Sequence, residues 1–410
     1  MLLYLAIGVP ALMALSHVFL TVTAWVYVAV DRRRTGPRPL FKGRGAVFVP
    51  CKGMEVDLEA NLEAIATQDH ADYTVTYIVE RIADPAYDVI RRIIARRPNA
   101  SIVVAGLTEK CGQKNHNLLQ GIAARLGKAD ALVTCDADVN PDPGWLNRLT
   151  GPLSDPATPI ATGFRWILPG HRTFGAYMHA IFNAYMSTMI ANKQFASVWG
   201  GSLAIRRDFW DKYNVAERWA TSVVDDMTVS AILVEHKIKR AYVLSCIVPS
   251  EDAITDLTES VAWFTRQILY VRYYLFPLWV IVVVLWIPTG LSPLAAPLFF
   301  AWAWHTGSHV ALVAGWSTTA LVALVAASLL VVRALGSPNF SAWTWFFITP
   351  LALPVGAWAI IESVLARNMR WRNIVYDIGP NGEVISIRRD DLPDGLPAQP
   401  ELSISTFSGE

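Results

Sequence analysis

The chain has 410 residues, 53% of them hydrophobic, with a mean hydropathy of +0.34 and a formal net charge of +1. Because soluble domains are typically about 45–50% apolar, this composition excludes an ordinary soluble protein. The near-zero net charge argues against nucleic acid as a partner, since nucleic-acid-binding domains are typically basic. The four cysteines include no Cys-x-x-Cys pair, so neither a disulfide framework nor a zinc site is predicted.

Two nearly uncharged segments flank a middle segment of ordinary charge density. Residues 1–31 exceed the roughly 20 apolar residues that cross a bilayer, and Asp31-Arg32-Arg33-Arg34 end them. The positive charge follows the apolar run, whereas it precedes the run in a cleaved signal peptide, so we predict a retained transmembrane helix over 1–31. Positive charge stays cytoplasmic, so these arginines predict that the following domain is cytosolic.

The middle segment alternates between strand-like and helix-like patterns, and we predict one domain over residues 44–258. Apolar, β-branched runs predict strands at 46–50, 73–79, 101–105, 131–135 and 161–166, with another ending at 205. Periodic patterns predict helices at 58–68, 85–96, 115–126, 174–192 and 225–236. This alternation predicts an α/β fold with a doubly wound, mostly parallel sheet.

Two carboxylates, Asp136 and Asp138, follow the strand predicted at 131–135. Open α/β sheets bind ligands at the carboxyl ends of their strands, and side chains two residues apart in an extended segment point the same way. Two converging oxygen ligands suit a hard divalent cation, Mg²⁺ or Mn²⁺, that holds a diphosphate. Glu80 ends another strand, so the acidic groups are expected along one edge. An Asx turn that ends the strand is the alternative.

Two further acidic features also have structural interpretations. Asp225 and Asp226 start a predicted helix, where the helix dipole favours carboxylates, and they are also candidates for catalysis. Asp84 precedes Pro85 at the start of the helix predicted at 85–96, as a helix cap does. The residues themselves leave both alternatives open.

Over roughly residues 44–275, several motifs follow one another in the order and spacing of a known group of enzymes. They are Val49-Pro50-Cys51-Lys52-Gly53, Val79-Glu80 with Asp84-Pro85-Ala86, Gly112-Gln113-Lys114 with Asn117-Leu118, Cys135-Asp136-Ala137-Asp138, Gly200-Gly201-Ser202 and Asp225-Asp226. In these motifs the chain resembles family 2-type glycosyltransferases of the GT-A fold, and within that group the ceramide glucosyltransferases and their bacterial relatives. The flanking apolar segments, and Trp371-Arg372-Asn373 with Tyr376 and Gly382, are similar too.

The resemblance implies roles for the residues that match these motifs. Asp226, with Asp225 beside it, matches the catalytic base. Asp138, aided by Asp136, matches the metal and diphosphate motif. The residues implied for the nucleotide sugar are Lys52, Glu80, Asp84, Lys114, Asp136 and Gly201, with Glu80 and Asp84 at the uridine base and ribose.

One motif departs from the pattern of these enzymes. They usually carry an Arg-Trp pair before the second membrane block, whereas this chain has Trp263-Phe264-Thr265-Arg266-Gln267. The resemblance implies an acceptor and diphosphate side on an interfacial helix over 259–272, formed by Trp263, Arg266, Gln267 and Arg272. Flanking charge at a membrane surface is the alternative for both arginines. The departure therefore concerns the acceptor and not the nucleotide sugar.

Residues 273–365 are almost uncharged and predict about four transmembrane helices, with two as the alternative. The apolar stretches lie near 273–289, 294–314, 317–335 and 343–365. An even number of spans would leave residues 366–390 as a cytosolic tail, and 391–410 are predicted to be disordered. His305 and His309 are predicted to share a helical face, as a metal pair or, alternatively, as packing residues.

Together these features predict an inverting, metal-dependent enzyme that transfers a hexose from a UDP-sugar to a membrane lipid. The predicted location is a bacterial inner membrane, with the catalytic domain in the cytoplasm. A processive polysaccharide synthase of the same fold is the enzyme alternative, although four or so spans are few for a polymer channel. A non-catalytic membrane scaffold or transport protein is the alternative from another class.

Overall fold

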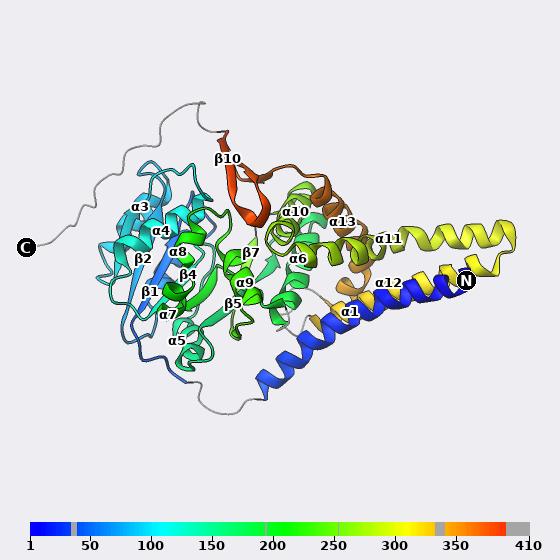
Figure 1. The fold of residues 1–410 in the computed structure, drawn as a ribbon, viewed down its shortest axis with the longest axis horizontal. Helices are drawn as coiled ribbons and strands as arrows, with labels where there is room; N and C mark the ends of the chain where they lie inside the picture. The colour runs from blue at the N-terminus through cyan, green and yellow to red at the C-terminus, as the bar shows by residue number, and fades with distance from the viewer. Residues whose placement is uncertain (34–38, 193–194, 253, 333–340, 391–410) are drawn as a thin grey trace, which may run out of the picture. The chain divides into compact units, whose positions relative to one another are not determined.

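The structure is a computed structural model that describes residues 1–33, 39–192, 195–252, 254–332 and 341–390 (Figure 1). The chain forms two compact units. The sheet unit comprises Gly36–Arg165, Ala196–Ser250 and Asn368–Glu410, and the helical unit comprises Met1–Thr35, Trp166–Phe195 and Glu251–Arg367. The predicted disorder of 391–410 lies outside the described residues.

The sheet unit is built on a mixed seven-stranded sheet with strand order β3-β2-β1-β4-β6-β5-β7. Strands β1 to β4 pair in parallel, and β6 is antiparallel to both β4 and β5. The strands are β1 (Gly45–Pro50), β2 (Tyr73–Val79), β3 (Ala100–Val104), β4 (Ala131–Cys135), β5 (Ile160–Pro169), β6 (Ser202–Arg206) and β7 (Arg240–Asp252). The chain runs outward from β1 to β3 and returns to β4 on the other side of β1. The ends of β1 and β4 therefore border the point where such sheets bind ligands.

Side chains of each strand alternate between two cores, one on each face of the sheet. Val47 and Val49 of β1 pack in the core under α2, α3 and α5, whereas Phe48 packs in the core under α4 and α7 to α9. These helices are α2 (Leu58–Ala66), α3 (Ala86–Ile94), α4 (Gln113–Arg125), α5 (Trp145–Thr150), α7 (Arg207–Lys212), α8 (Val215–Trp219) and α9 (Asp225–Glu235). Helices cover both faces, so the predicted doubly wound α/β class is confirmed.

A second, three-stranded antiparallel sheet forms from the tail and belongs to the sheet unit. Its strands are β8 (Met369–Trp371), β9 (Ile374–Ile378) and β10 (Val384–Arg389), with the short helix η3 (Pro380–Gly382) before β10. Tyr376 of β9 is fully buried. The sequence analysis did not predict these strands, nor β7.

The helical unit contains six helices in its described residues. They are α1 (Leu2–Arg32), α6 (Phe174–Ala191), α10 (Leu257–Tyr274), α11 (Phe276–Thr306), α12 (His309–Val332) and α13 (Ala342–Leu365). Four of them, α1, α11, α12 and α13, are long and apolar enough to cross a bilayer. The helix α6 is buried along most of its length and belongs to this unit, so residues 166–195 interrupt the domain predicted over 44–258.

Two predictions for the C-terminal region differ from the structure. Most of the apolar stretches at 273–289 and 294–314 form the single helix α11, so the described residues after Arg272 contain three long apolar helices and not four. This helix continues through three internal prolines, Pro288, Pro293 and Pro297, which apolar membrane helices tolerate. His305 and His309 do not share a helical face, because Gly307, with φ +65°, ends α11 between them.

Candidate active site

The carboxyl ends of the parallel strands carry the residues predicted for the nucleotide sugar. Lys52 follows β1, Glu80 follows β2 and Asp136 follows β4. Lys114 lies in the first turn of α4, the helix that follows β3. Parallel strands end at one edge of a sheet, so the fold brings these four residues to that edge, as the sequence predicts.

Lys114 joins two acidic side chains at this edge. Its Nζ lies 2.8 Å from Oδ1 of Asp136 and 3.4 Å from Oδ2 of Asp225, and its side chain is only 17% exposed. Burial lowers the pKa of Lys114, but the negative charges of Asp136, Asp225 and Asp226 outweigh burial and hold that pKa well above its usual value. Lys114 is therefore a permanent positive charge within an acidic cluster.

Two adjacent glycines make room for these carboxylates. A Cβ at Gly200 would lie 2.3 Å from Oδ2 of Asp225, and a Cβ at Gly201 would lie 2.4 Å from Oδ2 of Asp136. Thr134 of β4 holds the turn by donating a hydrogen bond to the Gly200 carbonyl over 2.6 Å. No side chain fits at either position without displacing an acidic residue.

Asp226 has the properties of a base that works near neutral pH. It lies in the first turn of α9, and its Oδ2 accepts a hydrogen bond from the Gly200 N–H over 2.9 Å. Burial, with the charge of Asp225, raises the pKa of Asp226 to about 7, although Lys114 and the Gly200 N–H act in the opposite direction. A carboxyl group with this pKa can take up and release a proton at neutral pH.

Asp138 has one paired and one unpaired oxygen. Its Oδ2 forms an ion pair with Arg165 of β5, a residue that the sequence analysis did not select. Its Oδ1 is buried and has no hydrogen-bond partner among the described residues. Burial raises the pKa of Asp138, while Arg165 opposes this rise. A buried carboxylate oxygen without a donor fits a hard divalent cation, which binds oxygen ligands.

Protein side chains alone would not complete such a metal site. In the described part of the chain, no group of three or more His, Cys, Asp or Glu residues has the geometry to hold a metal ion. Asp138 and Asp136 could therefore supply only part of the coordination shell. Phosphate oxygens and water would have to supply the rest, as is common for Mg²⁺.

The residues predicted for the uridine side are engaged with one another. Lys52 Nζ lies 3.1 Å from Oε2 of Glu80, and Arg81 lies 3.1 Å from Oε1 of the same buried carboxylate. Asp84 Oδ1 accepts hydrogen bonds from the Gly53 N–H and from the N–H of Ala86 at the start of α3, each over 2.9 Å. The N-cap of α3 is Pro85 and not Asp84 as predicted, but the Asp84 side chain still accepts the first N–H of the helix, and the same oxygen orders the loop after β1.

The C-terminal sheet holds two loops of this edge. Arg372 donates to the Lys52 carbonyl over 2.8 Å, and Arg389 donates to the Gln113 side chain over 2.6 Å. The Tyr376 hydroxyl accepts the Gln113 N–H over 3.2 Å, directly before Lys114. These roles were missed, although the Trp371-Arg372-Asn373 and Tyr376 motif pointed to the segment.

The residues predicted for the acceptor side lie on α10, in the helical unit. Arg272 donates to the carbonyls of Ser363 and Ala366 over 2.7 and 2.9 Å, so it satisfies the C-terminal end of α13. Trp263 packs edge-on against His179 at 4.4 Å between ring centroids. Gln267 donates to the Trp263 carbonyl within the helix over 3.4 Å, and Nε of Arg266 is buried with no hydrogen-bond partner among the described residues.

Solved structures with a similar fold are distant in sequence. One is a mannosyltransferase from Pyrobaculum calidifontis in complex with GDP-Man and Mn²⁺, at 16% identity, with a TM-score of 0.46, covering 88% of this chain and 99% of that chain. Another is glucosyl-3-phosphoglycerate synthase from Mycobacterium tuberculosis in complex with Mn²⁺, UDP and glucosyl-3-phosphoglycerate, at 17% identity and a TM-score of 0.38, covering 58% and 85%.

The family to which the chain belongs is shown by a comparison with protein-family models and not by these distant structures. The model of glycosyl transferase family 21 matches residues 9–384, which include most of both units and the strands β8 and β9 of the C-terminal sheet. The predicted class of the fold, a mixed GT-A sheet with apolar helices before and after it, agrees with this match. The chain therefore belongs to glycosyl transferase family 21 and is a membrane glycosyltransferase that uses a nucleotide sugar.

Proposed function

We propose that this enzyme transfers a hexose from a UDP-sugar to a membrane lipid and inverts the anomeric centre. One observation carries the proposal: Asp226, whose pKa is raised to about 7, lies beside the cluster of Lys114, Asp136 and Asp225 at the ligand-binding edge of the sheet. That arrangement combines a proton acceptor with groups suited to a diphosphate.

The donor side follows from the charges at the strand ends. Lys52, Glu80 and Asp84 bind the uridine and ribose, and Gly201 lets the donor approach the backbone. Lys114 offsets the charge of the diphosphate and exchanges Asp136 for phosphate oxygens when the donor binds. Donor binding therefore changes the electrostatic free energy of the Lys114 ammonium little, because one oxygen partner replaces another.

A divalent cation, Mn²⁺ or Mg²⁺, would be held by Oδ1 of Asp138 together with Asp136. When bound there, it would offset the negative charge of the leaving diphosphate. Arg165 pairs with Oδ2 of Asp138, so Oδ1 is the oxygen that remains for a cation. The orphaned buried oxygen is the observation that supports this part of the proposal.

Proton transfer belongs to Asp226. The ionised carboxylate takes the proton of the acceptor hydroxyl as that oxygen attacks the anomeric carbon from the face opposite the diphosphate. The bond to the diphosphate oxygen breaks in the same displacement, and the configuration inverts. Asp225 lies 3.4 Å from Lys114 Nζ, and its negative charge raises the basicity of the neighbouring Asp226 carboxylate.

A lipid acceptor is supported by the helical unit, in which four helices are long and apolar enough to cross a bilayer. The arginines after α1 favour a cytoplasmic catalytic domain, and we propose a bacterial inner membrane as its location. We assign Trp263, Arg266 and Gln267 on α10 to the acceptor side. The role of Arg272 at the end of α13 is structural.

The test is UDP release by the full-length, detergent-solubilised protein with Mn²⁺, a panel of UDP-sugars and total membrane lipids. We expect release that requires lipid, is abolished in Asp226→Asn and Asp138→Ala, and persists in the matched control Asp211→Asn on exposed α7. Asp226→Asn should still bind UDP. Long polymer as product would indicate a polysaccharide synthase, and absence of both release and UDP-sugar binding would favour a non-catalytic scaffold or transport protein.

A further inference from the structure

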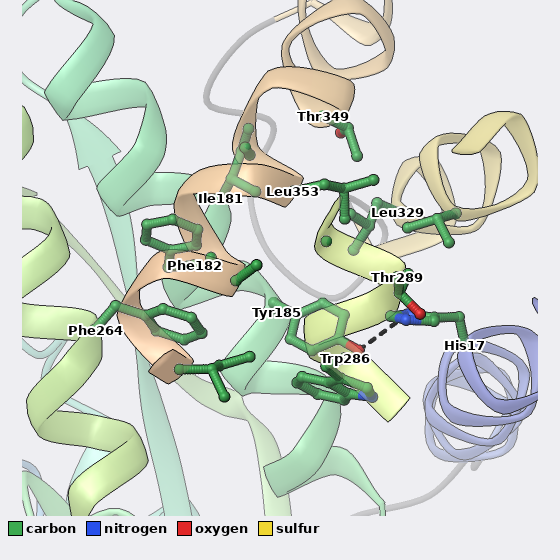
Figure 2. Close-up of a pocket in the computed structure, with 16 residues that line it drawn as sticks. His17, Ile181, Phe182, Tyr185, Phe264, Trp286, Thr289, Leu329, Thr349 and Leu353 are labelled. Carbon is green, nitrogen blue, oxygen red and sulfur yellow. Dashed lines mark hydrogen bonds between the residues drawn. The ribbon is translucent and has the colours of Figure 1, made fainter. Parts of the chain in front are cut away.

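The helical unit contains an apolar pocket that the mechanism above does not use (Figure 2). Its space of about 500 Å³ is partly open to the surroundings, and residues from α1, α6, α10, α11, α12 and α13 line it. Phe182 and Phe264 stack at 4.3 Å on one side, and Trp286 lies on another. Because four of these helices, α1, α11, α12 and α13, are long and apolar enough to cross a bilayer, the natural contents of such a space are hydrocarbon and not water.

The pocket lies at one end of the α11–α12 hairpin. Trp286 of α11 and Leu329 of α12 each lie about 32 Å from the turn at Gly307, counted at about 1.5 Å per helical residue. This distance equals roughly the 30 Å thickness of a hydrocarbon core. If the turn at Gly307 lies at one boundary of the bilayer, the pocket is close to the opposite boundary, where lipid backbones with their hydroxyl and carbonyl oxygens lie.

One polar side chain in the pocket is incompletely satisfied. His17 of α1 is only 4% exposed, its Nδ1 shares a hydrogen bond with the Tyr185 hydroxyl over 3.1 Å, and its ring stacks on Trp286 (Figure 2). Its Nε2 is buried and has no hydrogen-bond partner among the described residues. An unpaired imidazole nitrogen in an apolar setting is costly, so it indicates a polar atom that arrives with a ligand.

Small residues of α13 keep the pocket open. Ala352, Gly356 and Ala357 line it, and a Cβ at Gly356 would meet Phe182 and Phe264 only at 3.5 and 3.8 Å. A methyl group thus fits at Gly356 in ordinary contact, whereas a longer side chain would extend into the pocket. From Thr349 to Ile360 the lining of α13 extends over about 16 Å, the length of roughly twelve methylene groups.

We propose that this pocket binds the lipid acceptor: one hydrocarbon chain packs along α13, and a hydroxyl or carbonyl oxygen of the lipid backbone pairs with Nε2 of His17. The inference rests on the proposed lipid acceptor and names the place where it is held. His17 is a binding residue here and takes no part in proton transfer.

The experiment uses the full-length protein in nanodiscs with two probes, a ceramide and a diacylglycerol that each carry a diazirine on the acyl chain. After irradiation, adducts are mapped by peptide mass spectrometry. The variants are Gly356→Ala and Gly356→Leu, which fill the pocket in steps. The control is Gly8→Leu on α1, because an added Cβ at Gly8 meets nothing within 4 Å.

We expect adducts on α13 between Thr349 and Ile360, reduced about tenfold in Gly356→Leu, less in Gly356→Ala, and unchanged in Gly8→Leu. The lipid KM for UDP release should rise in the same order, while UDP binding stays constant. If adducts spread evenly over lipid-facing residues, and Gly356→Leu forms as many adducts as the wild type, the proposal that lipid binds in this pocket is overturned. Wild-type protein that releases no UDP with any lipid would instead overturn the proposed function.

The role of Nε2 has a separate readout. His17→Phe keeps an aromatic ring and removes both nitrogens, whereas Tyr185→Phe removes only the bond to Nδ1. We expect the lipid KM to rise about tenfold in His17→Phe and little in Tyr185→Phe. Equal effects in the two variants would show that their mutual hydrogen bond matters and would overturn the pairing of Nε2 with the lipid.

Discussion

The pKa of Asp226 leads to a quantitative expectation for the pH dependence of transfer. If this carboxylate is the base, the active fraction of the free enzyme follows its ionisation, whose pKa is raised to about 7 by burial and Asp225. From about pH 6 to about pH 8 the ionised fraction of such a group rises from roughly one tenth to nine tenths. We therefore expect kcat/KM to rise about tenfold over this interval and to level off above it.

The raised pKa of Asp226 also makes the stability of the folded protein depend on pH. The native pKa of Asp226 lies above the ordinary value of 3.8, so the folded protein holds this proton more tightly than the unfolded chain. The contribution to stability is complete below about pH 4 and is lost as the pH rises through about 7. Asp226→Asn cannot ionise, so it should gain stability relative to wild type across this window.

Two assays check this reasoning on one preparation. UDP release at subsaturating UDP-sugar gives kcat/KM against pH, and thermal unfolding in the same buffers gives the stability difference between wild type and Asp226→Asn. Asp211→Asn serves as the control, because its carboxylate is exposed and pairs only with Arg207. A flat kcat/KM profile over this interval, or a stability difference that does not grow with pH, would refute the assignment of this pKa to the base.

Three further predictions concern neighbouring groups. Gly201→Ala should lower kcat/KM about a hundredfold, because the added Cβ would lie 2.4 Å from Oδ2 of Asp136. The control Gly8→Ala should have wild-type kinetics, and a wild-type kcat/KM for Gly201→Ala would show that the turn can move. Arg389→Met should raise the UDP-sugar KM about fivefold with little change in kcat, as expected for lost hydrogen bonds worth about 1 kcal/mol. A loss of kcat alone would contradict a role of Arg389 in ordering the segment around Gln113 that binds the donor. Asp138→Ala should weaken Mn²⁺ binding at least about tenfold, measured by calorimetry without substrate, and unchanged binding would place the cation elsewhere.

Much of the sheet edge could be predicted because its signals are local. Strands β1 to β4 are short apolar runs, and each is followed within a few residues by a charged group such as Lys52, Glu80 or Asp136. The rule that parallel strands share one carboxyl edge then converts spacing along the chain into proximity. The pairing of Lys114 with Asp136 needs more than this rule, because β2 and β1 separate β3 from β4 and only the packing of α4 on β1 and β2 brings Lys114 near Asp136.

The missed features depend on pairings between distant segments. Arg165 reaches Asp138 because the sheet places β5 two strands from β4, an order that cannot be read from the sequence. In the sequence, Arg165 is only a single arginine in an apolar strand. Arg372 and Arg389 reach the donor loops from the far end of the chain. The continuity of α11 was also missed, and its three internal prolines do not break the helix.

The connectivity of the C-terminal helices also decides how many of them cross the membrane. The strands β8 to β10 belong to the sheet unit, in which Tyr376 accepts the Gln113 N–H. With the sheet unit on one side of the membrane, we predict an even number of crossings between α10 and β8. The helices α11 and α12 are joined by a short turn at Gly307 and form one crossing out and one back. We infer that α13 begins and ends on the same side and lies along the boundary. Its Glu362 accepts hydrogen bonds from Trp358 and from Thr265 of α10, a carboxylate network that belongs at a polar surface and not at the centre of a bilayer.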